Sequence, residues 1–279
     1  MHGQGFNKYS LSIIPEYFSA VLLLEAERLL WSNSSPLRFS FPNFSLYAGI
    51  NHAVFTKKCG VGERHSGGFN LSFEAGEEES LVIDRLHKVR KTTRSSSLVL
   101  MKQTHSDLVE VLSQVPEGTL VQFECDAIIS PIKGVGLLVR TADCQAVLIY
   151  DPKAKAVAAV HCGWRGAVKN ILAKVIGKMV KEFDSDPEHI KVAIGPSLGP
   201  CCSEFKGYMK IFPEGFREFM VRDNYFDMWA VSCWQLIEAG VKEENIEISA
   251  LCTKCNTHLF YSYRGEKAPG RFGASIGLC

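Results

Sequence analysis

The residues best suited to chemistry lie in one stretch, 139–167, where Cys144, His161 and Arg165 stand near the ends of apolar runs. A thiol and an imidazole that meet can share a metal ion, or can act as a nucleophile and its general base. The guanidinium of Arg165 offers a fixed positive charge with bidentate reach for an anion. Which chemistry results depends on the elements that position these side chains.

Two apolar runs, 146–150 and 156–160, are joined by a short polar link that contains a proline. Such a link between β-rich flanks is typical of a tight hairpin. A two-residue turn at its centre places Cys144 directly opposite His161, with Cβ atoms about 5 Å apart. A turn longer by one residue would place Cys162 opposite Cys144 instead.

A helix is expected directly after this hairpin. Beyond Gly163 and Gly166, apolar residues recur at helical spacing as far as Phe183, which predicts an amphipathic helix. Glycines at a helix start let backbone N–H groups approach an anion such as phosphate, and Arg165 adds charge there. The alternative is that the two glycines only turn the chain.

The composition is that of a globular chain. Its 279 residues are 46% hydrophobic and 22% charged, enough for a large core in one domain. A formal net charge of +1 argues against nucleic acid or a membrane surface as a partner, so anion recognition must be local. The ten cysteines form no regularly spaced framework, which indicates a reducing compartment and a cytoplasmic location.

The first 45 residues are interpreted as an N-terminal extension of unknown role, which ends in a turn-rich stretch with two prolines, and residues 46–279 as the main domain. The apolar run 20–24 is far too short to span a bilayer and lacks the flanks of an export signal. An amphipathic helix or an additional leading segment is the expected structure there.

Polar groups that could serve a site also occur before the central stretch. A glycine-rich loop begins near Lys57 and closes on Asn70, and such a loop can line a pocket with backbone donors and cations. His105 follows a short apolar strand, 98–101. A histidine in that position is usually structural unless other functional groups join it.

The remaining pattern is one of alternating strands and helices. It predicts a strand that begins near residue 47, helices over 77–91 and 226–239, and strands over 125–129, 136–140, 190–194 and 246–251.

The cysteines near the C-terminus have the spacing of half a zinc knuckle, formed by Cys252, Cys255 and His258. A structural zinc site needs four ligands, and no second pair lies nearby in the sequence at the usual spacing. We therefore do not predict zinc there. The adjacent Cys201 and Cys202 are interpreted as small residues in a tight loop.

Taken together, the motifs QTHSD, TADCQAVLIYD, HCGWRGA, IGPSLGPCC and CT…YSYRGEKAPGR resemble the laccase-domain family. This family was first described as multicopper polyphenol oxidases, and its members are now regarded as purine nucleoside phosphorylases with an accompanying adenosine deaminase activity. The similarity extends from about residue 50 to the C-terminus. The order of TADC followed by HxGWRG is specific to the family.

The resemblance implies an α+β fold in which mixed β-sheets pack as a sandwich flanked by helices. It also implies a metal site, generally zinc with copper as the alternative ion. The ligands would be His105 of QTHSD, Cys144 of TADC and His161 of HCGWRG. Two imidazoles and one thiolate leave a tetrahedral zinc with an open position, which is typical of a catalytic site.

The reaction implied by the resemblance is phosphorolysis of adenosine, inosine or methylthioadenosine to free base and ribose 1-phosphate, with deamination of adenosine by an activated water. Small-molecule nucleosides and phosphate are the expected partners, and the oligomeric state is left open. For phosphate we expect Arg165, Lys57 and Arg271, with Asn70 in the adjoining loop. Lys57 stands where relatives usually have arginine, which keeps the charge but loses the bidentate fork.

Two acidic residues complete the expected catalytic set. Asp126 lies between QTHSD and TADC, and Asp143 lies within TADC. Either could carry a proton to the leaving base or orient a ligand histidine. Near Arg264 the chain has one arginine where many relatives have a pair, which weakens the case for a second phosphate contact there.

Three other interpretations use the same residues. A metal-free hydrolase or deamidase would use Cys144 as nucleophile and His161 as base. A copper-dependent polyphenol oxidase needs several coppers and many histidines, whereas this chain has eight, without His-x-His pairs. In a binding domain without enzymatic activity, His105, Cys144 and His161 would be buried packing residues.

Overall fold

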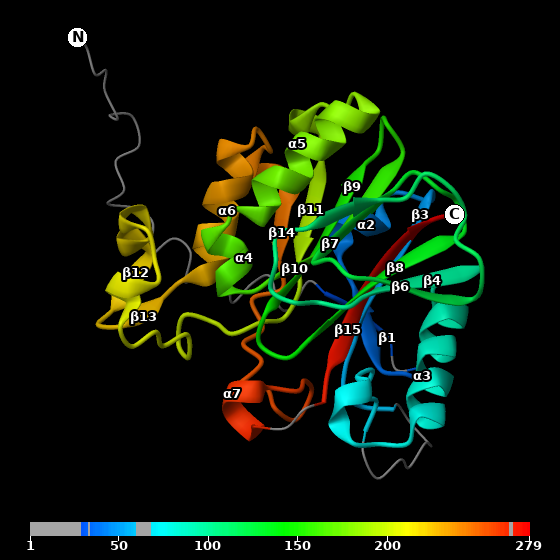
Figure 1. Cartoon of the computed structure of the whole chain (residues 1–279), viewed down its shortest axis with the longest axis horizontal. Helices are drawn as coiled ribbons and strands as arrows, with labels where there is room; N and C mark the ends of the chain where they lie inside the picture. Colours follow the sequence, from blue (N-terminus) through cyan, green and yellow to red (C-terminus); the bar gives the residue numbers. More distant parts are fainter. Residues whose placement is uncertain (1–28, 33, 60–67, 268–269) are drawn as a thin grey trace.

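The apolar runs of the sequence form two mixed β-sheets that pack face to face, with helices on both outer faces (Figure 1). The structure is a computed structural model and describes residues 29–32, 34–59, 68–267 and 270–279. This arrangement confirms the expected sandwich of mixed sheets flanked by helices.

The larger sheet has seven strands in the order β1-β2-β3-β15-β8-β4-β6. Their bounds are β1 Leu30–Ser32, β2 Arg38–Ser40, β3 Ile50–Phe55, β15 Phe272–Leu278, β8 Val135–Thr141, β4 Ser97–Met101 and β6 Leu120–Phe123. The C-terminal strand β15 is thus a central strand, antiparallel to both β3 and β8.

The second sheet has six strands in the order β14-β11-β9-β10-β7-β5. Their bounds are β14 Ile246–Ile248, β11 Lys191–Ile194, β9 Gln145–Asp151, β10 Ala156–Cys162, β7 Ala127–Ser130 and β5 Val109–Val111. A separate two-stranded ribbon joins β12 Met220–Arg222 to β13 Tyr225–Phe226. Every residue of β9 and β10 is buried, because the other sheet covers one face and helices cover the other.

Six α-helices are described: α2 Pro42–Ser45, α3 Glu79–Thr92, α4 Trp164–Val168, α5 Ile171–Phe183, α6 Met228–Glu238 and α7 Tyr263–Glu266. Short 3₁₀ turns lie at Phe73–Ala75, Pro187–His189, Tyr208–Lys210, Glu214–Phe219 and Glu243–Asn245. The strands and helices expected along the chain are confirmed, with ends that differ by a few residues.

The expected helix after Gly166 is wrong in one respect, because it is divided into α4 and α5. Asn170 stands between them with a positive φ of 54°. Its side chain accepts a hydrogen bond from the backbone N–H of Ala173 and so begins a new helix. With only five residues, α4 carries a small dipole, which weakens the expected anion site at its start.

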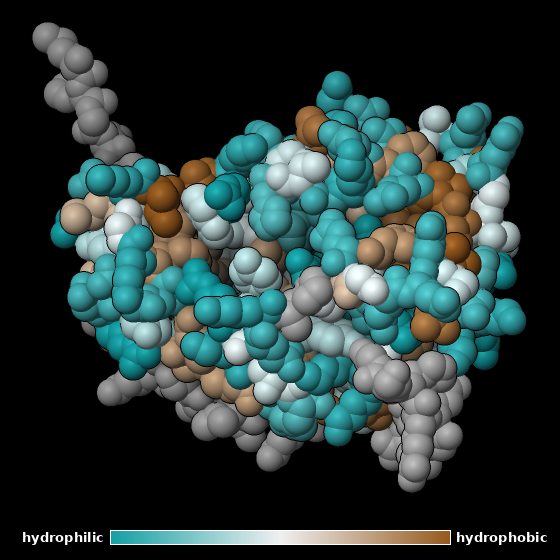
Figure 2. All heavy atoms as spheres, turned by 60° about the horizontal axis from the view of Figure 1, so that its bottom comes forward, coloured by the Kyte–Doolittle hydropathy of each residue, from teal (hydrophilic) through white to brown (hydrophobic). Residues whose placement is uncertain are grey.

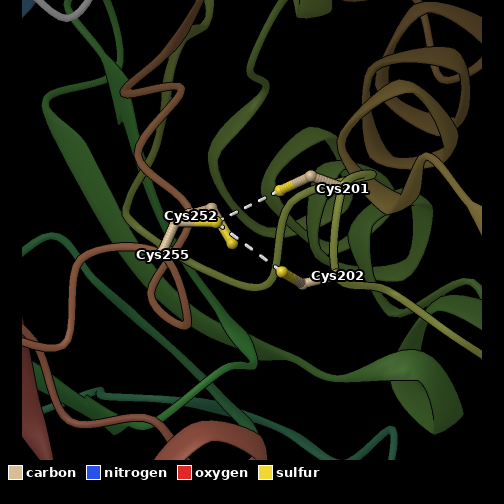
Figure 3. A group of neighbouring side chains, drawn as sticks. All are labelled: Cys201, Cys202, Cys252 and Cys255. Carbon is tan, nitrogen blue, oxygen red and sulfur yellow. Dashed lines mark hydrogen bonds between the residues drawn. The ribbon is translucent and has the colours of Figure 1, made fainter.

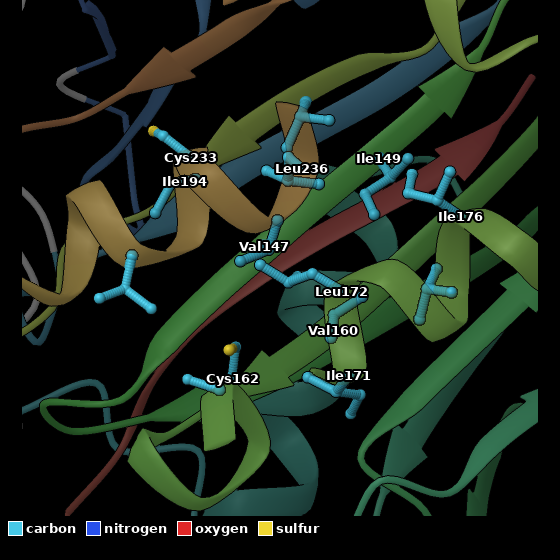
Figure 4. Close-up of a cluster of buried hydrophobic side chains, with 14 of the residues drawn as sticks. Val147, Ile149, Val160, Cys162, Ile171, Leu172, Ile176, Ile194, Cys233 and Leu236 are labelled. Carbon is cyan, nitrogen blue, oxygen red and sulfur yellow. The ribbon is translucent and has the colours of Figure 1, made fainter. Parts of the chain in front are cut away.

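The buried hydrophobic residues form three clusters, one between the two sheets and one on the outer face of each sheet. Apolar residues of both sheets meet between them, with Val99 and Ile276 of one sheet against Leu148 and Val157 of the other. The outer face of the six-stranded sheet packs under α5 and α6 (Figure 4). The outer face of the seven-stranded sheet packs against α3.

The described residues before 46 take part in the fold. Strands β1 and β2 lie at one edge of the larger sheet, and α2 contacts β11 of the other sheet through Asn43. Phe39, Phe41 and Phe44 are completely buried. Residues 1–28, where we expect most of the leading segment, lie outside the described residues.

The face of the molecule in Figure 2 is largely hydrophilic, with hydrophobic residues gathered in a few areas. None of the helices in the described part of the chain combines the length and apolar composition that a membrane crossing requires.

Candidate active site

The β9–β10 hairpin brings Cys144 and His161 to one edge of the sandwich. The turn is longer than we expected: Asp151 pairs with Ala156, so His161 pairs with Ala146 and not with Cys144. Oδ1 of Asp151 accepts hydrogen bonds from the backbone N–H groups of Lys153 and Ala154, which stabilises this wider turn.

The register differs from the predicted one by two residues, so the faces of the strands stay as expected. Ala146 and Leu148 point into the space between the sheets, as do Val157 and Ala159. Because side chains alternate along a strand, Cys144 and His161 continue these two rows to the sheet edge. Cys162 points the other way, into the core beneath α4 and α5 (Figure 4).

His105 joins them from the other sheet. It follows β4, and its Nε2 atom lies 3.8 Å from Sγ of Cys144. The rings of His105 and His161 are edge to face with centroids 4.9 Å apart. One ligand atom from each of the three residues lies within 4.8 Å of the others. The fold thus brings together the three side chains that the resemblance implies as metal ligands.

Asp126 supports this group from behind. It is fully buried at the start of β7, and its Oδ1 atom lies 2.7 Å from Nδ1 of His161. A carboxylate on Nδ1 fixes the proton there and leaves Nε2 of the imidazole as the ligand atom.

The same carboxylate holds the loop that carries His105. It accepts hydrogen bonds from the backbone N–H groups of Thr104, His105 and Ser106, and from the Ser106 hydroxyl. His105 has a positive φ of 58°, a conformation uncommon for residues other than glycine. The contacts to Asp126 offset the cost of that conformation.

Gly163 lets the chain pass close to the group. A Cβ atom at this position would lie 2.8 Å from Sγ of Cys144 and 3.2 Å from Cδ2 of His105. Any side chain there would displace both residues. The glycine is therefore required by close approach and not only by the turn.

The electrostatics of the group favour a thiolate. Burial alone would raise the pKa of Cys144, but the charge of His161 and a hydrogen bond from His105 lower it to about 6. The pKa of His161 is raised in turn, against the effect of burial, by Cys144 and Asp126. Two imidazoles and a thiolate, backed by a carboxylate, are a donor set suited to a borderline-soft cation such as zinc.

Asp143, the other acidic residue expected to carry a proton or to orient a ligand histidine, is held by three hydrogen bonds. Its carboxylate accepts hydrogen bonds from the hydroxyls of Thr253 and Ser262 and from the backbone N–H of Arg264. It therefore ties the turn before Cys144 to the segment that leads into α7.

A cavity of about 610 Å³ opens above the group. Its wall carries five cations and several apolar and aromatic side chains. The cations are Lys102, Arg140, Arg165, Arg264 and Arg271, and the aromatic residues are Phe73, Trp164, Phe205 and Tyr263. This volume and this mixture of polar and apolar groups suit a small polar ligand with an aromatic part.

The four residues expected to bind phosphate have separate positions. Arg165 and Arg271 line the cavity. Lys57 is not among its lining residues and forms an ion pair with Glu266, with Nζ and Oε1 2.7 Å apart. Asn70 is buried and accepts a hydrogen bond from the backbone N–H of Arg271, so it positions that residue and does not line the cavity.

Arg140 was not among the expected site residues, although its position just before TADC at the end of a buried strand was an available signal. Its guanidinium donates to the carbonyls of Leu71 and Met101. Burial lowers its pKa, and the nearby charge of Arg271 lowers it further. Gln103 exchanges two hydrogen bonds with the Arg140 backbone and so links the ends of β4 and β8.

Solved structures with the same fold support the architecture. YlmD from Geobacillus stearothermophilus superposes with a TM-score of 0.77 at 24% identity, over 90% of this chain and 98% of that chain. The hypothetical protein YfiH of Bacillus licheniformis gives 0.76 at 24% identity, over 89% and 99%.

Relatives by sequence carry two activity names. A purine nucleoside phosphorylase of Aquifex aeolicus is 34% identical over 215 residues, which cover 75% of this chain and 98% of the relative. One of Bacteroides thetaiotaomicron is 28% identical, over 80% and 89%. Adenosine deaminase RL5, from an unknown prokaryotic organism, is 28% identical, over 71% and 81%.

The family model described as multi-copper polyphenol oxidoreductase laccase matches residues 51–279. This match covers the site and both sheets apart from β1, β2 and the first residue of β3. The chain therefore belongs to the multi-copper polyphenol oxidoreductase laccase family, in which curated relatives are named purine nucleoside phosphorylase.

Proposed function

We propose that this chain cleaves purine nucleosides with phosphate, giving free base and ribose 1-phosphate, and that the same site deaminates adenosine. The observation that carries the proposal is the group of His105, Cys144 and His161 at a cavity lined by arginines and aromatic rings. Relatives named purine nucleoside phosphorylase and adenosine deaminase support both reactions. Adenosine, inosine and methylthioadenosine are the expected substrates.

Zinc is the metal that we propose for this group. Zinc–sulfur and zinc–nitrogen bonds of about 2.3 and 2.0 Å place tetrahedral ligand atoms about 3.5 Å apart, close to the 3.8 Å between Cys144 and His105. When bound by these three residues, the ion would act as a Lewis acid. Copper is the alternative ion for this donor set.

The chain's own residues prepare the site for substrate. Asp126 holds the proton on Nδ1 of His161 and keeps the His105 loop in place. Asp143 holds the segment of Tyr263 and Arg264 against the cavity. We propose both aspartates as positioning residues.

The arginines of the cavity wall are the residues that we propose to bind phosphate. The charge of Arg271 lowers the pKa of Arg140, and an anion bound between the two guanidinium groups would offset this repulsion. Arg165 also lines the cavity, and its guanidinium lies over Trp164, 4.3 Å from the ring centroid. We propose Arg271 and Arg165 as phosphate contacts, with Arg140 added, and aromatic residues such as Trp164 and Phe205 as stacking surfaces for the purine.

A metal-free hydrolase would use the same hydrogen-bonded chain of Cys144, His161 and Asp126, which has the order of a nucleophile, base and orienting acid. The position of His105 favours the metal site, because a catalytic triad does not require a second imidazole beside the thiol.

The location of the protein in the cytoplasm stays a prediction from its cysteine content.

The test is chromatographic. Purified protein is incubated with adenosine or inosine, with and without phosphate, beside the variants Cys144→Ala and Cys279→Ala. Cys279 is an exposed free cysteine at the chain end and serves as the control. We expect phosphate-dependent release of free base, and phosphate-independent conversion of adenosine to inosine, both lost only in Cys144→Ala. No turnover of either nucleoside by protein with bound zinc would reject the proposal.

A further inference from the structure

Four cysteines meet outside the active site. Cys201 and Cys202 lie in the loop after β11, and Cys252 and Cys255 lie in the loop after β14. Their sulfur atoms all lie within 4.8 Å of one another. Figure 3 shows the two pairs pointing toward each other from opposite loops.

This finding corrects the interpretation of the sequence, which left the pair Cys252 and Cys255 without partners. The second pair comes from about fifty residues earlier in the chain. His258, which completed the half knuckle in sequence, is exposed and not part of the group.

The distances fit a shared ion better than a disulfide. Sγ of Cys255 lies 3.6 Å from Sγ of Cys201 and 3.6 Å from Sγ of Cys202. A disulfide requires about 2.05 Å, and these four cysteines form none. Four sulfurs at about 2.3 Å from a tetrahedral zinc are separated by about 3.8 Å, which is close to the observed spacing.

The backbone around the group is prepared for a thiolate. The backbone N–H groups of Gly199 and Cys255 hydrogen-bond to Cys252. Gly199 can come this close because it has no side chain. A Cβ atom at this position would lie 3.0 Å from Cβ of Cys252. N–H donors on sulfur stabilise the negative charge that metal binding requires.

We propose that Cys201, Cys202, Cys252 and Cys255 bind a structural zinc ion, as a second metal site distinct from the His105–Cys144–His161 group. Four thiolates fill every position of a tetrahedral ion and leave none for substrate, which is the mark of a structural site.

The ion would join two loops that form part of the active-site wall. The first loop supplies Leu198, Ser203 and Phe205 to the cavity, and the second leads to Tyr263 and Arg264. The loops already touch through backbone hydrogen bonds between Ser197 and the residues on either side of Cys252. The second loop also reaches Asp143, beside Cys144, through the hydroxyl of Thr253. A zinc ion there would hold this wall in place.

The first measurement is the zinc content of the full chain purified under reducing conditions and supplied with zinc. We expect two zinc ions per chain in the wild type and in the control Cys279→Ser. The double variant Cys201→Ser/Cys255→Ser, which changes the two exposed cysteines, should retain one zinc ion per chain. The single variant Cys201→Ser should also retain one zinc ion, and it provides the test if the double variant does not fold. His105→Ala should also retain one.

Cobalt substitution separates the two sites. The cobalt form of His105→Ala should keep the intense sulfur-to-metal absorption of a tetrathiolate site, and that of Cys201→Ser/Cys255→Ser should lose it. The proposal would be overturned if the wild-type chain holds only one zinc and its four cysteines are not metal-bound. They would then react with iodoacetamide in the native zinc-supplied protein, or be joined in disulfides. Because metal content is measured without substrate, this result does not depend on the proposed catalytic function.

Discussion

Oδ1 of Asp126 lies 2.7 Å from Nδ1 of His161, and the same carboxylate holds the loop of His105 through three backbone N–H groups. One buried side chain therefore orients two of the three candidate metal ligands, although it does not itself line the cavity.

Replacing Asp126 by Asn should weaken metal binding. The amide is uncharged and accepts through only one oxygen, so it cannot serve both His161 Nδ1–H and the His105 loop. Loss of such a supporting contact typically lowers metal affinity by about 10–100-fold. Zinc affinity measured by competition with a chromogenic chelator checks this. An unchanged affinity would show that Asp126 only stabilises the fold. Asp186→Asn, at an exposed turn outside the cavity, is the matched control.

Gly163→Ala should also disrupt the metal group. The added methyl would lie 2.8 Å from Sγ of Cys144, a separation that forces the ligand to move. We expect zinc affinity and nucleoside turnover to fall together, by about 10-fold or more.

Gly177→Ala provides the control, because this exposed glycine of α5 has no atom within 4 Å of the new methyl. It should keep full zinc content and raise the free energy of unfolding by about 0.5–1 kcal/mol. Equal zinc content in both variants would contradict the steric role of Gly163.

The meeting of Cys144 and His161 was predictable from the hairpin that carries them, whereas His105 was expected beside them only from the resemblance of QTHSD to a family motif. The hairpin register was wrong by two residues, yet a strand repeats every two residues, so the error left both side chains on the same face. Their role as metal ligands stays a prediction.

Other features could not be predicted because they depend on contacts between distant residues. Strand β15 contains Gly273 and Gly277, which suggest a loop, but neighbouring atoms of Leu71 and Val135 leave no room there for a side chain. Lys57 lies outside the cavity because it pairs with Glu266, far away in sequence. The four-cysteine group likewise joins two loops that no local pattern relates.

Arg271→Gln should weaken phosphate binding in the proposed reaction. Loss of one charge-assisted hydrogen bond costs about 1.5–3 kcal/mol, so the KM for phosphate should rise by about 10–100-fold. Deamination of adenosine, which uses no phosphate, should change much less. Steady-state rates at varied phosphate concentration check this. Arg217→Gln, exposed and remote from the cavity lining, serves as the control. An equal loss of both activities would place Arg271 in general substrate binding.

His52 should make stability sensitive to acid. Its Nε2 atom accepts a hydrogen bond from the backbone N–H of Phe41 at 2.8 Å, so the folded state requires the neutral ring. Burial between β2 and β15 lowers its pKa from 6.5 to about 4. The unfolded chain therefore binds this proton first as the pH falls. The neutral ring's stabilising contribution is complete above pH 6.5 and is lost progressively down to about pH 4, at a cost of at most about 3 kcal/mol.

The variant His52→Gln separates this contribution from other acid effects. Glutamine can still accept the hydrogen bond from Phe41, but it does not titrate. In urea unfolding at pH 7.5, 5.5 and 4.5, the wild type should lose more free energy of unfolding than His52→Gln as the pH falls. Replacement of the exposed His258 by Gln is the matched control and should leave the wild-type pH dependence intact. Parallel curves for the wild type and His52→Gln would show that this ring is protonated without cost in the folded protein.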